Sequence, residues 1–220
     1  MNFQKSLPKR NPYVSRESEN CIAVLSLVSP SQLSWRIILS FLYMLWLPII
    51  ISSVVVFVLS AMAWTVSPHH HGDYKATECE DSLLQFFREA KIQPGRYMFP
   101  FAKGDPSKDP VLKQKMEDGP VGSLTVFPGI DMKNNLIWTY VFFLVTSTLI
   151  AYLAWFAMDG HPDKSFMRVF RLVGTASILI YSCSAIPNDI WFKRPMVTNL
   201  IDGIIYGLTT GLIFAAMWPL

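Results

Sequence analysis

Residues Ile37–Val66, IILSFLYMLWLPIIISSVVVFVLSAMAWTV, contain no charged side chain. A helix of this length would measure about 45 Å, which exceeds the roughly 30 Å hydrocarbon core of a bilayer. We therefore predict a transmembrane helix that tilts, protrudes or kinks at Pro48, which removes one helical hydrogen bond. Ala61-Met62-Ala63 resembles a signal-peptide cleavage site, but the apolar run is about twice the usual length of a signal-peptide core. This length favours an uncleaved signal anchor.

Three more apolar runs lie further along the chain, at residues 136–158, 166–187 and 196–218. The run at 166–187 carries Arg168 and Arg171 near its start, and their long side chains can reach the lipid head groups. Apolar residues make up 51% of the chain and charged residues 16%. Because the apolar residues form continuous runs without a period of 2 or 3.6, the sequence predicts an integral membrane protein with four transmembrane helices.

The polar insert at residues 67–135 separates the first of these runs from the second. It holds ten of the sixteen acidic residues and nine of the nineteen basic ones. A capping box at Thr77-x-x-Glu80 predicts a first helix, and alternation over Arg96–Phe101 predicts a strand. Asp109 can cap a second helix, and Val121–Phe127 forms a second β-rich run. The insert is therefore expected to be a small α+β lobe with the order α-β-α-β.

Two arrangements of this lobe are open at the level of sequence. The second helix could connect a parallel pair of strands or an antiparallel pair. Since two strands alone are marginally stable, we expect the first helix to cover the sheet with Phe86 and Phe87.

The N-terminal residues 1–36 are polar and basic, and we expect a cytoplasmic tail there. Basic residues near membrane spans tend to lie on the cytoplasmic side, and the tail holds five Lys and Arg residues. The loop after the second span also has more basic residues near the spans than the loop after the third. The pattern predicts cytoplasmic N and C termini and an extracytoplasmic lobe, in a membrane of the bacterial inner (cytoplasmic) type. The net charge of +3 and the mixing of acidic with basic residues give no support to nucleic-acid binding.

Gly203, Gly207 and Gly211 repeat every four residues along the fourth run. Small residues at this spacing form a flat stripe on which another helix can pack closely in lipid. Packing within the bundle is the favoured interpretation. The alternative is contact with another membrane protein or self-association through this helix.

Asp202 is the one carboxylate well placed to lie inside a span, and Asn199 and Tyr206 share its helix face. An ionisable group inside a membrane is costly and points to function. Because Asp202 lies near the outer end of its span, an interfacial acid exposed to water or paired with Lys193 or Arg194 is favoured over a proton or ion relay. These three residues are nevertheless the candidate ligand or ion site.

Histidine and aspartate side chains that could bind a metal occur at His69, His70, His71 and Asp73. Consecutive histidines point in different directions and no spaced second ligand pair is evident, so we predict no metal site and keep His69, His71 and Asp73 as weak candidates. Asp159, His161 and Asp163 form another such trio, for which a polar turn is the better interpretation. The three cysteines are too far apart in sequence to indicate a disulfide framework or a CxxC site.

No catalytic triad, phosphate-binding glycine loop or HExxH motif is present in the sequence. We therefore predict no catalytic residues and no cofactor, and an enzyme is the least favoured class. The leading hypothesis is an accessory, scaffold or binding subunit whose lobe engages a partner. The alternative is a small transporter or channel component that uses the Asp202 site.

Overall fold

The computed structural model describes residues 30–105 and 108–219. Most of the predicted tail, residues 1–29, lies outside the described residues. The chain divides into two compact units, Met1–Trp46 with Pro219 and Leu47–Trp218 with Leu220. Every site discussed below belongs to the second unit.

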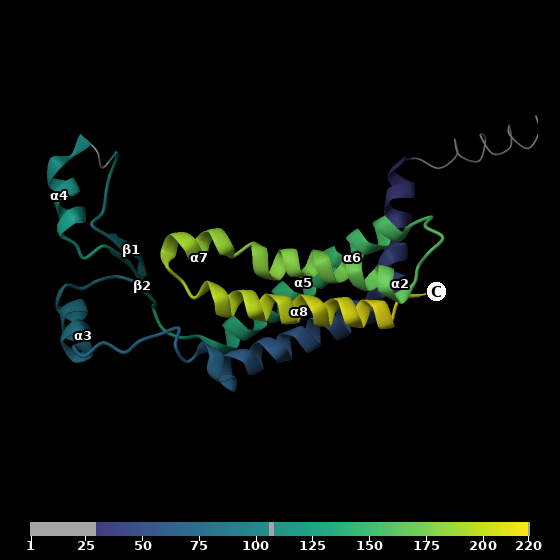
Figure 1. Ribbon diagram of the computed structural model, residues 1–220, viewed down its shortest axis with the longest axis horizontal. Helices are drawn as coiled ribbons and strands as arrows, with labels where there is room; N and C mark the ends of the chain where they lie inside the picture. Colours follow the sequence, from purple (N-terminus) through teal and green to yellow (C-terminus); the bar gives the residue numbers. More distant parts are fainter. Residues whose placement is uncertain (1–29, 106–107, 220) are drawn as a thin grey trace, which may run out of the picture. The chain divides into compact units, whose positions relative to one another are not determined.

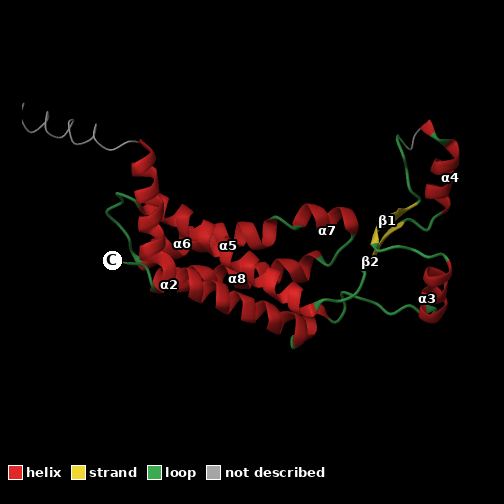
Figure 2. Ribbon diagram, turned by 180° about the vertical axis from the view of Figure 1, so that it is seen from behind, coloured by secondary structure: helices red, strands yellow, loops and turns green. Residues whose placement is uncertain are grey.

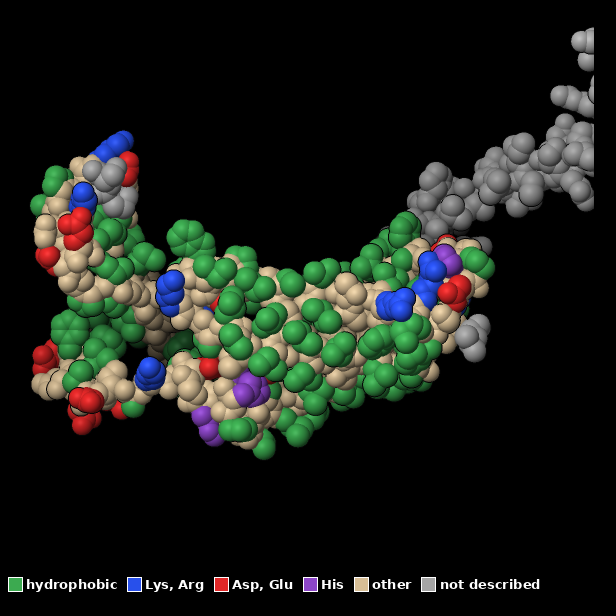
Figure 3. Space-filling view, in the orientation of Figure 1, with side chains coloured by type: hydrophobic (Ala, Val, Ile, Leu, Met, Phe, Trp, Pro, Cys, Tyr) green, Lys and Arg blue, Asp and Glu red, His purple; other side chains and the backbone are tan. Residues whose placement is uncertain are grey.

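Within the described residues, four helical segments are long and apolar enough to cross a membrane, as the sequence predicts. They are Ser40–Thr65 within helix α2 (Pro30–Thr65), then α5 (Met132–Met158), then Phe166–Phe192, and finally α8 (Met196–Ala216) (Figure 1). Figure 3 shows hydrophobic side chains spread along the visible sides of these helices, with few charged side chains among them. An apolar outer surface is what a lipid-facing bundle requires.

The third of these segments is not one regular helix. It consists of α6 (Phe166–Ile178), a π-helical turn η3 (Leu179–Cys183) and α7 (Ile186–Phe192). Pro187, where the sequence pattern ended this span, instead stands in the first turn of α7. Proline is tolerated there because the first N–H groups of a helix have no partner within it. A side-chain hydrogen bond joins this irregular segment to α8, since the Ser182 hydroxyl donates to the Leu200 carbonyl at 3.4 Å.

The glycine stripe of α8 faces α6 and η3. A Cβ atom added at Gly203 would lie 2.7 Å from the backbone carbon of Tyr181, and one at Gly207 would lie 2.7 Å from the backbone nitrogen of Ile178. At Gly211 it would lie 2.8 Å from the Cα atom of Gly174. Such close approach is possible only because the α8 residue at each of these contacts has no side chain.

Between α2 and α5 the elements follow in the expected order of helix, strand, helix and strand. They are α3 (Glu80–Glu89), β1 (Gly95–Phe99), α4 (Pro110–Asp118) and β2 (Gly122–Val126), preceded by the short 3₁₀ helix η1 (Pro68–His70). Figure 2 shows the two strands as a small sheet among helices. They pair antiparallel, with Tyr97 opposite Leu124. This decides between the two arrangements that the sequence left open.

The two helices of this segment differ in how well the sequence predicted their starts. Asp109 caps α4 as expected, because its carboxylate accepts from the N–H groups of Val111 and Leu112 at 3.0 and 3.1 Å. The predicted capping box of α3 is wrong, since the N-cap is Cys79 and makes no side-chain bond. Acidic residues in the first turn of α3 favour this start instead, through the helix dipole.

The expected cover of the sheet by α3 is also wrong. Within the described residues, no side chain of α3 or α4 is buried, and Leu83 and Phe86 are 38% and 57% exposed. A two-stranded sheet with five residues in each strand offers little apolar area on which a helix could dock. A compact lobe therefore stays a prediction, while its elements and strand pairing are established.

Candidate functional site: a histidine–aspartate cluster

The chain turns sharply where it leaves α2. Ser67 precedes the 3₁₀ helix η1, and Pro68 stands in its first turn, where the fixed proline φ angle suits a helix start. The His71 N–H donates to the Pro68 carbonyl at 3.1 Å, and the Asp73 N–H donates to that of His70 at 3.1 Å. With three residues per turn, successive side chains diverge by about 120°. His70 is consequently buried and His71 exposed.

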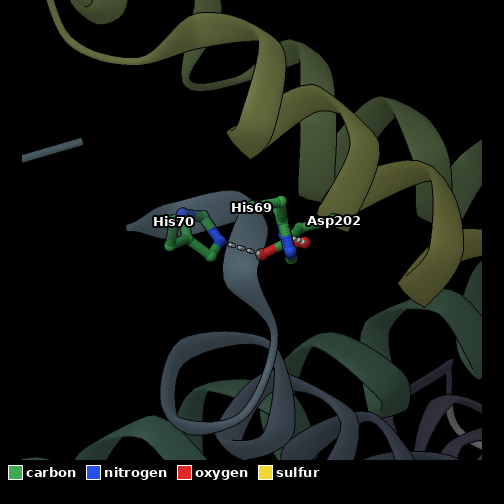
Figure 4. Close-up of side chains that lie close together, drawn as sticks. All are labelled: His69, His70 and Asp202. Atoms are coloured by element: carbon green, nitrogen blue, oxygen red, sulfur yellow. Dashed lines mark hydrogen bonds and ion pairs between the residues drawn. The ribbon is translucent and has the colours of Figure 1, made fainter. Parts of the chain in front are cut away.

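Asp202, in the second turn of α8, contacts the imidazole rings of both His69 and His70. The His69 Nε2 atom lies 2.8 Å from Asp202 Oδ1, and the His70 Nε2 atom lies 2.9 Å from Asp202 Oδ2. Figure 4 shows both rings directed at this carboxylate. The Tyr206 hydroxyl, one turn further along α8, also donates to Oδ2 at 3.2 Å. Asp202 is only 6% exposed, so these contacts replace the water that a carboxylate otherwise needs.

His70 bridges two carboxylates. Its Nδ1 atom lies 2.5 Å from Asp73 Oδ2, while Nε2 faces Asp202. Trp64 stacks on the imidazole with ring centres 4.0 Å apart and planes 10° apart, which fixes the ring orientation. When both carboxylates are ionised they can only accept, and both ring nitrogens of His70 must then donate, as they do in an imidazolium.

The pKa of His70 reflects two opposing causes. Burial lowers the pKa, because it disfavours the charged ring. The hydrogen bonds to Asp73 and Asp202, and the charges of these two groups, raise it. The net result is a pKa above the usual 6.5.

Neighbouring hydroxyl groups extend the cluster on both sides. The Ser67 hydroxyl contacts the Nδ1 atom of His69 at 2.5 Å. The Thr198 hydroxyl donates to the Pro195 carbonyl at 3.0 Å and lies 3.3 Å from Asp73 Oδ2. The turn at residues 67–73 is thereby tied to the first two turns of α8.

A cavity of about 270 Å³ adjoins Asp202. Asp189 lines it and is 4% exposed, and its carboxylate accepts from the Asn199 side-chain amide at 3.0 Å. Arg194 lines the same cavity, so a cation and two carboxylates share one polar space. Trp64 closes part of its apolar wall.

The structure brings together some of the residues singled out in the sequence and separates others. Asp202 and Tyr206 are in contact, whereas Asn199 bonds Asp189. The partners of Asp202 are His69, His70 and Tyr206, where the sequence analysis expected water, Lys193 or Arg194. Asp73 reaches the cluster through His70, and His71 does not join it.

Sequence reasoning missed the central position of His70 and the part played by Trp64. The contact between His70 and Asp202 joins residues 132 positions apart. The one available signal was that a carboxylate in a span must find a partner, and that signal does not say which of several candidates it is.

The trio Asp159, His161 and Asp163 forms a polar turn. The Asp163 N–H donates to His161 Nδ1 at 3.1 Å, and the Ser165 N–H donates to the Asp163 carboxylate at 2.9 Å. The hydrogen bond from Ser165 lowers the pKa of Asp163, because it stabilises the charged form.

Among the described residues, His69, His70 and Asp202 offer three ligand atoms that all lie within 4.8 Å of one another. Such a set can join the turn to α8 through ion pairs, hold a proton or bind a cation. Comparison of the chain with protein-family models, curated proteins and solved structures found no match in any of the three.

Proposed function

We propose that this protein is a membrane-embedded accessory or binding subunit. Its membrane helices form a fixed base, and the segment between α2 and α5 engages a protein partner. The observation that carries the proposal is the exposed apolar side of α3. Leu83, Leu84 and Phe86 are 38%, 41% and 57% exposed, on a helix whose other residues apart from Phe87 are polar. Full burial of an exposed Leu or Phe side chain is worth about 1.5–3 kcal/mol, and these partly covered side chains would each gain about half of that against a partner.

The histidine–aspartate cluster supports this role because it fixes one end of the segment between α2 and α5. The turn at residues 67–73 is joined to α8 through Asp202 and Thr198. The glycine stripe already packs on α6, so we place the partner contact on the segment between α2 and α5 and not on the stripe.

We further propose cytoplasmic N and C termini, an uncleaved first span and a membrane of the bacterial inner (cytoplasmic) type. The excess of basic residues in the tail supports this orientation. Cys79 is exposed and lies in the proposed extracytoplasmic segment. With Cys21 and Cys183 replaced by serine, a membrane-impermeant maleimide should label Cys79 in intact cells. Labelling only after permeabilisation would reverse the orientation.

Site-specific photocrosslinking in native membranes tests the partner. A photoreactive phenylalanine analogue at Phe86 should give one crosslinked product of defined mass, identified by mass spectrometry. The same analogue at Lys113, an exposed position on the polar side of α4, is the matched control. Equal or absent crosslinking at both positions would contradict a partner on α3.

A transporter or channel component is the second candidate, favoured by a buried carboxylate beside a polar cavity. Asp202, Asp189 and Arg194 line that cavity. If this candidate is correct, Asp202→Asn should abolish cation flux in reconstituted vesicles while the protein stays folded. Unchanged flux and stability in the variant would remove it.

A further inference from the structure

We propose that His69, His70 and Asp202 bind one divalent transition-metal ion of the zinc class. The site lies where the chain leaves α2 and meets α8. It does not depend on a partner for the segment between α2 and α5. The proposal rests on the geometry of the three side chains, on the partners behind them and on the buried charge.

The ligand atoms converge on one small space. The two Nε2 atoms lie 2.8 and 2.9 Å from different oxygens of the same carboxylate, and all ligand atoms fall within 4.8 Å. Around a tetrahedral zinc ion with bonds of about 2.0–2.1 Å, neighbouring ligand atoms lie about 3.3 Å apart. To bind the ion, the two hydrogen-bonded pairs would have to separate by a few tenths of an ångström, and any ligand atoms near the 4.8 Å limit would have to move closer together.

Each imidazole is also supported from behind. The second nitrogen of a metal-binding histidine almost always contacts a carboxylate, carbonyl or water, which sets the tautomer and ring orientation. Here His70 Nδ1 contacts Asp73, and His69 Nδ1 contacts the Ser67 hydroxyl. With a metal on Nε2, a neutral His70 would donate its Nδ1 proton to Asp73. The bridge between two carboxylates would then no longer require an imidazolium.

The charges of the buried side chains also favour a divalent metal ion at this site. Asp202 and the Asp73 side chain are both largely removed from solvent, and buried carboxylates need a compensating positive charge. A divalent ion bound between Asp202 and two neutral imidazoles would balance both. Trp64 stacks on His70 and shields this side of the site from water.

The donor set selects the class of metal. Ca²⁺ and Mg²⁺ prefer sites made only of oxygen ligands, and Cu⁺ prefers sulfur ligands. Two imidazoles with one carboxylate suit Zn²⁺ or Co²⁺ and leave a fourth position for water. Three ligands from the described residues therefore indicate an open site.

Metal binding by the full-length protein in detergent tests this proposal. The protein is purified with a tag that contains no histidine and is treated with a chelator. One sample is then titrated with Co²⁺. In a second sample, bound Zn²⁺ is measured by equilibrium dialysis with elemental analysis. We expect one ion per chain and the visible absorption of tetrahedral Co²⁺. His70→Ala and Asp202→Asn should weaken binding by more than the roughly 10- to 100-fold typical for loss of an outer partner, and Asp73→Asn should fall within that range.

His71→Ala is the matched control, because it removes a neighbouring histidine that is exposed and outside the cluster. Its affinity should equal that of the unaltered protein. If it loses as much affinity as His70→Ala, the run of histidines binds metal at the surface and the proposal fails. Absence of binding at micromolar Co²⁺ or Zn²⁺ would also overturn the proposal, and the cluster would then serve only as a set of ion pairs between the turn and α8.

X-ray absorption of the zinc-loaded, unaltered protein removes the dependence on variants that could misfold. Two imidazole ligands with Zn–N distances of about 2.0 Å are the expected result. A coordination shell made only of oxygen, or one that contains sulfur, would contradict the assignment. Partner crosslinking at Phe86 is read separately, so failure of either proposal leaves the other measurable.

Discussion

At Asp202 a single carboxylate connects two parts of the chain that are distant in sequence. It contacts His69 and His70 in the turn after α2, and Tyr206 in its own helix. A buried carboxylate left without such partners would cost several kcal/mol. The position of the turn at residues 67–73 is thus coupled to the charge of one side chain.

The charge of His70 should make stability depend on pH in the chelator-treated protein. Its folded-state pKa is raised above 6.5, so the charged ring stabilises the folded state fully below pH 6.5. This contribution is lost as the pH rises through the folded-state pKa. The unfolding midpoint of the unaltered protein minus that of His70→Gln should therefore shrink with rising pH. His71→Gln is the control, and a difference that grows with pH would contradict the prediction.

The hydroxyl of Tyr206 should contribute a modest amount. Tyr206→Phe removes a hydrogen bond to a buried carboxylate and keeps the ring, and because this bond is long at 3.2 Å we expect a loss of about 1.5 kcal/mol in the free energy of unfolding, the low end for a bond to a charged group. Tyr74→Phe, at an exposed tyrosine, should have little effect. Denaturant titration in detergent measures both. Equal effects of the two changes would argue against the contact with Asp202.

Among the elements, α6 and α8 depend most on small residues. Their backbones approach closely where Gly211 meets Gly174, and a side chain added at Gly211 would have no room there. The π-helical turn η3 continues this contact beyond the end of α6, against the first half of α8. Packing rather than helix propensity therefore determines which residues are tolerated along this seam.

Gly211→Ala tests the seam. Alanine would by itself favour a helix by about 1 kcal/mol over glycine. Its Cβ atom, however, would lie 2.8 Å from the Cα atom of Gly174, so we expect a net destabilisation of about 1–3 kcal/mol. Gly72→Ala is the control because nothing lies within 4 Å of its added Cβ, and its effect should stay within about 0.5 kcal/mol. A Gly211→Ala protein as stable as the control would refute the close approach.

For the molecule as a whole, stability is concentrated in the four long apolar helices. The buried residues with the largest side chains lie in these helices, whereas α3 and α4 bury none of their described side chains. Few buried contacts mean a low free energy of local opening. The segment between α2 and α5 is therefore expected to open first.

The isolated segment Thr77–Gly129 should accordingly be only marginally stable, because a domain this small buries little surface. Circular dichroism during heating should show a gradual loss of signal without a cooperative transition. The full-length protein in detergent serves as the comparison, and its helical signal should persist to higher temperature. A sharp transition of the isolated segment at high temperature would contradict the prediction.

The sequence by itself determined the four helices that are long and apolar enough to cross a membrane, and the order of elements between the first two. These depend on local properties, namely the length of apolar runs, the cap at Asp109 and the alternation before Phe101. Only the tertiary structure decided that the strands pair antiparallel, that α3 leaves the sheet uncovered and that Asp202 meets His69 and His70. The contacts of Asp202 span more than 130 residues. The reason is physical: a buried charge requires a partner, but local sequence does not specify which distant side chain the packing of the helices will bring to it.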